Sequence, residues 1–148
     1  MTEVAFYTNV LDETRLIGKL LRKAHNVGRK LHISVRNEQH SEKVVKDLYE
    51  AEPTSFFGIN SSASDDVHDL TSVIIRYTSH YIHNDIIINL TSEIPDNFSA
   101  FKRVIEIVGR DEENIGAARD RYRWYKDRGY SIATHKLQTL DPPAQRRT

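Results

Sequence analysis

Short apolar runs rich in β-branched residues alternate along this chain with longer segments of helical periodicity. Residues 4–7 and 31–35 have the length and composition of strands, and apolar side chains recur at helical spacing between them. Asp12 is placed to cap that helix and Gly28 to close it. A strand, a helix and another strand in succession are typical of a parallel sheet with right-handed crossovers. The order predicts an α/β fold.

The middle of the chain predicts a second helix and two more strands. Ser41 would cap the helix, and Pro53 would stop it. The polar, aperiodic residues 53–72 predict a loop. We expect strands over the β-branched segments 73–77 and 86–90. The polar residues between these two strands are compatible with a hairpin or a long loop.

The last third of the chain contains the clearest helix. A short helical turn is expected after Pro95, and a strand over residues 104–108. The helix that follows has acids in its first turn and bases in its later turns, as the helix dipole favours. Gly129 is a natural end for it, and residues 130–134 predict a final strand.

Length and charge limit the class of protein. A chain of 148 residues is one domain, and we expect residues 1–137 to form a mostly parallel, twisted sheet flanked by helices. Residues 138–148 are expected to be a disordered tail. The 21 Lys and Arg balance the 21 Asp and Glu, which argues against non-specific binding to DNA phosphates. There is no apparent signal peptide or membrane-spanning run, so we expect a cytoplasmic protein.

The sequence contains no recognisable catalytic or cofactor motif. No glycine-rich phosphate loop and no nucleophile elbow are present, and the absence of cysteine excludes thiolate chemistry. His80 and His83, with Asp85, could supply metal ligands, but residues three apart on a strand point to opposite faces. We interpret them as polar residues between strands. We therefore predict no catalytic residue, no metal site and no cofactor.

One face of the last helix is a candidate binding surface. At 100° per residue, one aromatic and three basic side chains fall within an arc of about 100°. These residues are Arg119, Tyr122, Arg123 and Lys126. Such a face suits a carboxylate attached to an apolar residue, because arginine offers a bidentate fork and the ring offers a wall. The alternative is a solvated basic face. Ala118 and Tyr125 would face the sheet.

Several segments together resemble a known family. The most specific is Ala-Arg-Asp-Arg-Tyr-Arg-Trp-Tyr at 118–125, followed by Gly-Tyr at 129–130. Weaker matches are Ala-Phe-Tyr at 5–7, Asp-Leu-Tyr at 47–49 with Ser-Phe at 55–56, and Asp-Ile-Ile-Ile-Asn-Leu at 85–90. Over roughly residues 3–137, with a poor match at 58–72, the chain resembles the chi subunit family of bacterial DNA polymerase III holoenzyme.

The resemblance implies an adaptor without an active site. Its fold would be related to nucleotide-binding sheets but would lack the phosphate loop. Its partner would be the acidic C-terminal tail of single-stranded-DNA-binding protein, which ends in a Pro-Phe-type sequence and a free carboxylate. DNA would be contacted only indirectly. The alternative is a nucleotide-binding or small-ligand-binding α/β enzyme domain, with its pocket at the carboxyl ends of the strands.

The resemblance also implies which residues bind. The tail site carries over onto Arg119, Tyr122 and Arg123, with Val108 and Thr134 as the adjacent wall. The basic face described above adds Lys126 to this set, and Ile115 stands where some members have another basic residue. A second surface would bind the psi subunit, where one is present, and through it the clamp loader. That surface corresponds to Tyr49, Phe56 and Phe57, which could alternatively just cover the sheet edge.

Overall fold

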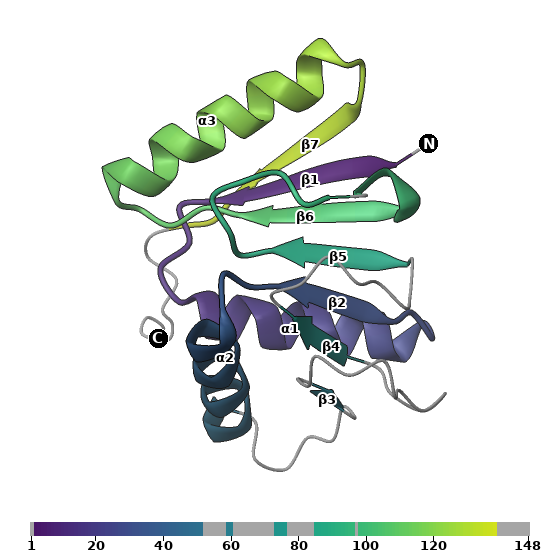
Figure 1. Cartoon of the computed structure of the whole chain (residues 1–148), viewed down its shortest axis with the longest axis vertical. Helices are drawn as coiled ribbons and strands as arrows, with labels where there is room; N and C mark the ends of the chain where they lie inside the picture. Colours follow the sequence, from purple (N-terminus) through teal and green to yellow (C-terminus); the bar gives the residue numbers. More distant parts are fainter. Residues whose placement is uncertain (1, 52–58, 61–72, 77–84, 97, 139–148) are drawn as a thin grey trace.

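The computed structural model describes residues 2–51, 59–60, 73–76, 85–96 and 98–138. Within them, seven strands form one sheet in the order β3-β4-β2-β5-β6-β1-β7, and all paired neighbours run parallel (Figure 1). The strands are β1 (Glu3–Thr8), β2 (Leu31–Ser34), β3 (Ile59–Asn60), β4 (Val73–Arg76), β5 (Ile86–Asn89), β6 (Arg103–Ile107) and β7 (Ser131–Lys136). The predicted parallel α/β fold is confirmed.

Helices cover both faces of the sheet. They are α1 (Glu13–Asn26), α2 (Glu38–Ala51) and α3 (Glu112–Asp127), with a single 3₁₀ turn at η1 (Phe98–Ala100). Alternate residues of β6 separate the two layers: Ile105 and Ile107 pack with α1 and α2, whereas Val104 packs with the cluster beneath α3. Each face of the sheet therefore has its own apolar core. No helix in the described ranges has the length and apolarity needed to cross a bilayer.

The connections that follow two neighbouring strands leave the sheet on opposite faces. β1 and β6 are paired, but the chain leaves β1 through α1 on one face and leaves β6 through α3 on the other (Figure 1). In open α/β sheets, ligands bind at the carboxyl ends of strands where the connections diverge in this way. The topology therefore directs the search for a site to the ends of β1 and β6.

Helix boundaries agree with the sequence at α1 and differ at α2. The Asp12 side chain accepts a hydrogen bond from the backbone N–H of Arg15, as predicted for a cap. The predicted cap at Ser41 is wrong, because Ser41 is buried inside α2. The helix begins earlier: Asn37 Oδ1 accepts a bond from the backbone N–H of His40 at 2.8 Å. Asparagine and serine cap helices about equally well, so residue type alone did not decide between them.

The hairpin considered between the fourth and fifth strands is also wrong. β4 and β5 lie on opposite sides of β2 and run parallel to it, whereas a hairpin would make them antiparallel neighbours. The connecting residues 77–84, which include His80 and His83, lie outside the described residues, as does nearly all of the predicted 53–72 loop. The predicted tail falls outside them too, except for Gln138.

Two glycines of α3 provide a test of backbone conformation. Gly129 ends the helix at φ +82°, whereas Gly116 lies inside it, and an added Cβ would meet no atom within 4 Å at either position. Gly129→Ala should lower the free energy of unfolding by about 1 kcal/mol, because alanine is strained at positive φ. Gly116→Ala should raise it by about 0.5–1 kcal/mol. Urea denaturation followed by circular dichroism measures both, and changes of the same sign would contradict this account.

Candidate functional site

A cavity of about 540 Å³ lies between α3 and the carboxyl ends of β1, β6 and β7. We call it the α3 cavity. Its apolar lining comes from Phe6, Val108, Ile115, Ala118 and Tyr122. Its remaining lining residues are Thr8, Asn9, Gly109, Arg110, Arg119, Thr134 and Lys136. Three of the twelve lining residues are cations and none is an acid, although the whole chain has equal numbers of both.

An aromatic contact forms one wall of the α3 cavity. Phe6 points from β1 toward α3, where its ring lies edge-to-face with Tyr122 at a centroid distance of 5.5 Å. Phe6 is buried, but Tyr122 remains 37% exposed. Tyr122 is therefore supported from one side while part of its ring stays open to a ligand.

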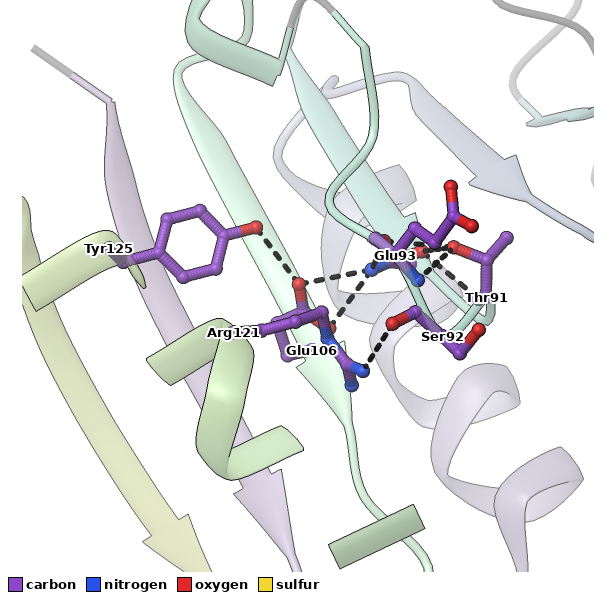
Figure 2. A network of polar contacts seen from close by, with 7 residues as sticks. Thr91, Ser92, Glu93, Glu106, Arg121 and Tyr125 are labelled. Carbon is purple, nitrogen blue, oxygen red and sulfur yellow. Dashed lines mark hydrogen bonds and ion pairs between the residues drawn. The ribbon is translucent and has the colours of Figure 1, made fainter. Parts of the chain in front are cut away.

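A buried polar network attaches α3 to the sheet (Figure 2). Glu106, on β6, is fully buried and accepts hydrogen bonds from Arg121 Nε at 3.0 Å and from the Tyr125 hydroxyl at 2.9 Å. Asn89 Nδ2 donates to both carboxylate oxygens at 3.1 and 3.0 Å. Arg121 Nη1 also donates to the Ser92 carbonyl. The network thus joins β5, β6, α3 and the residues following β5.

The donors around Glu106 favour its charged form. Burial raises the pKa of the Glu106 carboxyl, while the Arg121 guanidinium and the hydrogen bonds from Asn89 and Tyr125 act in the opposite direction. Burial and the neighbouring carboxylate raise the pKa of the Tyr125 hydroxyl, which stays protonated as a donor. Because all these contacts are donors, they stabilise a carboxylate rather than a carboxylic acid.

The network also fixes which face of α3 is turned toward the cavity. Ala118 and Tyr125 are buried, as predicted, and Arg121 is buried with them. Of the predicted tail-binding residues, four line the α3 cavity: Val108, Arg119, Tyr122 and Thr134. Arg123 and Lys126 are exposed on the same helix but outside the lining. The binding role of all six residues stays a prediction.

Four polar lining residues were not predicted from the sequence. Thr8 ends β1 and Asn9 follows it, Arg110 precedes α3, and Lys136 ends β7. They come from segments far apart in the chain, so only the strand order brings them together. Asn9 has φ +61°, and an asparagine directly after a strand is the one local signal that could have indicated a special turn.

Trp124 has a structural role that the sequence did not indicate. Its ring contacts Phe98 edge-to-face, and Arg128 Cζ lies 3.8 Å from the centroid of the indole. Phe98 also contacts Tyr125 and Tyr130. Trp124 thus closes the core beneath the C-terminal half of α3.

A second, more polar cavity of about 630 Å³ also lies at the carboxyl edge of the sheet, and it is lined by residues of α1, α2 and the first part of α3. Its lining mixes acids with bases, and Lys43 Nζ lies 2.7 Å from Asp47 Oδ2. Because its charges neutralise one another, this cavity is a weaker candidate for a ligand of one sign.

The predicted second surface is described only in part. Tyr49 is 51% exposed on α2, while Phe56 and Phe57 lie outside the described residues.

No cofactor site is evident among the described residues. They contain no group of three or more His, Asp and Glu that could hold a metal ion. The turn after β1 reads Thr8-Asn9-Val10 and has no glycine that would let a pyrophosphate approach the backbone. Fold and site define a parallel α/β protein whose cavity at the strand ends is built from side chains, not from a phosphate loop.

Comparison with known proteins gives the family. The model of the family "DNA polymerase III chi subunit, HolC" matches residues 1–133. DNA polymerase III subunit chi of Pseudomonas aeruginosa is 40% identical over 58 residues, which is 39% of this chain and 41% of that protein. The Haemophilus influenzae protein of the same name is 27% identical over 112 residues, or 74% and 77% of the two chains. This chain belongs to the DNA polymerase III chi subunit family.

The buried ion pair gives a test of how α3 is held. Arg121→Met leaves Glu106 buried without its cation, which should lower the free energy of unfolding by about 3 kcal/mol near neutral pH. The pKa of Glu106 then rises further, so the stability of the variant is retained at low pH and lost as pH rises through that raised value. Urea denaturation should therefore show a smaller loss at about pH 5 than at about pH 7.5.

The double variant Glu106→Gln/Arg121→Met is the control for this pH dependence. It lacks the buried carboxyl, so its own free energy of unfolding should show no pH dependence from this position between the two pH values. A single variant whose loss is equal at both pH values would show that Glu106 does not titrate as described.

Proposed function

We propose that this chain is a non-catalytic adaptor that binds the acidic C-terminal tail of single-stranded-DNA-binding protein and links it to the clamp loader. The observation that carries the proposal is the lining of the α3 cavity, which has three cations, no acid and a largely apolar wall. A peptide ending in an aromatic residue with a free carboxylate complements this lining in both charge and polarity. Family membership supports a role in the DNA polymerase III complex.

The terminal ring of the tail enters beside Phe6, Val108 and Tyr122, which removes its apolar surface from water. Arg119 lies one turn before Tyr122 on the same face of α3, so its guanidinium receives the carboxylate of that terminal residue. Arg123 and Lys126 extend the positive charge along α3 and attract the acidic tail. We expect micromolar affinity, about −8 kcal/mol, that falls as salt is added.

Tyr49 is the described part of a second surface, which we assign to the psi subunit. It lies on α2, which packs on the sheet face opposite α3. Two partners bound on opposite faces would not compete for space. This separation supports a link between single-stranded-DNA-binding protein and the clamp loader, because a link must hold both at once.

The alternative is a nucleotide-binding or small-ligand-binding enzyme domain. The two cavities at the carboxyl edge of the sheet lie where such a domain would bind its ligand. Thermal-shift measurements against nucleotides and divalent metals separate the two ideas. Strong stabilisation by ATP or NAD would replace the adaptor proposal.

Arg119→Ala should raise the Kd for a fluorescent tail peptide at least tenfold, or about 1.4 kcal/mol, without unfolding the domain. The reason is the loss of the guanidinium that pairs with the terminal carboxylate. Fluorescence anisotropy measures the affinity, and circular dichroism verifies the fold. Arg29→Ala is a matched control, since Arg29 is exposed and precedes β2 at the opposite edge of the sheet. An unchanged Kd in Arg119→Ala would refute the assignment.

Tyr49→Ala should weaken binding of purified psi and leave the Kd for the tail peptide unchanged, because the two surfaces lie on different faces. Arg119→Ala should do the reverse. Isothermal titration with each partner measures both effects. If Tyr49→Ala lowered tail affinity as much as Arg119→Ala, the two surfaces could not be independent.

A further inference from the structure

Two cations of the α3 cavity are not assigned to the terminal residue of the tail. Arg110 lies between β6 and α3, and Lys136 is the last residue of β7. Both are exposed. They border the cavity at the carboxyl edge of the sheet, whereas Arg119 borders it from α3.

Arg110 is held in place by the turn that follows β1. Its Nε donates to Asn9 Oδ1 at 3.1 Å, and Asn9 Nδ2 donates to the Leu137 carbonyl at 2.8 Å. Among the described residues, neither Nη atom of Arg110 has a partner. A guanidinium held through Nε keeps both Nη groups available as a fork for a carboxylate, and little side-chain freedom remains to be lost on binding.

Arg123 and Lys126 offer a less prepared alternative. They do not line the cavity, and Arg123 Nη1 lies 3.7 Å from the Asp120 carboxylate in an exposed ion pair. A ligand acid binding Arg123 would have to compete with Asp120. No acid lines the α3 cavity beside Arg110 and Lys136.

We infer that Arg110 and Lys136 bind the side-chain carboxylates that precede the terminal residue of the peptide. This inference rests on the proposed function. With the terminal carboxylate at Arg119, the preceding acids lie about 3.3–3.6 Å further per extended residue. The peptide would therefore leave the cavity across the carboxyl edge of β1 and β7, not along α3. Arg110 and Lys136 determine specificity for an acidic sequence, and Arg119 for a free C-terminus.

Two peptides distinguish these roles in the full chain. Both are labelled at the N-terminus and have a free C-terminal carboxylate. The acidic peptide ends in Asp-Asp-Asp-Ile-Pro-Phe. The other, called the amide peptide for its asparagine side chains, ends in Asn-Asn-Asn-Ile-Pro-Phe. Arg110→Ala and Lys136→Ala should each raise the Kd of the acidic peptide about fivefold and that of the amide peptide less than about twofold. The control Arg29→Ala should change either value less than about twofold.

Asn9→Gly tests whether Asn9 is a positioning residue. Glycine accepts φ +61° without strain, so the variant removes the side chain that holds Arg110 and keeps the turn. The acidic peptide should lose about two- to threefold in affinity, while the amide peptide and the fold, monitored by circular dichroism, stay unchanged. Equal losses for the two peptides would show that Asn9 acts on the cavity as a whole.

The outcomes separate this inference from the proposed function. If the parent chain binds the acidic peptide and Arg119→Ala abolishes that binding, but Arg110→Ala affects both peptides equally or neither, the inference alone is overturned. A preference for acids that depends on Arg123 and not on Arg110 would overturn it as well, because the peptide would then run along α3. If the parent chain bound neither peptide, the proposed function and the inference would fall together.

Discussion

The buried ion pair between Glu106 and Arg121 is the interaction on which the geometry of the site depends. A carboxylate without water must find donors, and Glu106 takes them from Arg121, Tyr125 and Asn89. Two of these donors lie one turn apart on α3, so satisfying the carboxylate sets the rotation of that helix about its axis. Tyr122 then falls at the cavity with Arg119, because their positions on the helix follow from those of Arg121 and Tyr125.

The location of the cavity has a separate cause in the topology. Because α1 and α3 leave adjacent strands toward opposite faces, the ends of β1 and β6 are left uncovered between them. A nucleotide-binding sheet uses such a place for backbone contacts to phosphate, through a glycine-rich turn. Here the turn after β1 instead presents the Asn9 side chain, which engages Arg110. The same edge of the fold thereby offers side-chain cations rather than backbone amides.

Local patterns predicted the helices and most strands, because periodicity and capping are properties of short segments. They also predicted the exposed face of α3 that carries Arg119 and Tyr122. They did not distinguish Arg121 as the buried base among several in α3, since charge alone does not tell a paired arginine from a solvated one. The signal was distant: Glu106 is an acid inside an apolar strand and needs a buried cation. Arg110 and Lys136 depended on strand order, which no local pattern contains.

Overall neutrality and a cationic cavity are compatible once the apolar lining is considered. DNA phosphates attract proteins that carry an excess of positive charge. Here the 21 basic residues are balanced by 21 acidic ones. Within the α3 cavity the balance is local, with three cations around Phe6, Val108 and Tyr122. A phosphate backbone would match the cations but not the apolar wall. The bases of a single strand do carry rings, but the balanced overall charge provides no long-range attraction to nucleic acid. An acidic peptide with an aromatic C-terminus would match both parts of the cavity, which is why a protein tail is the proposed ligand.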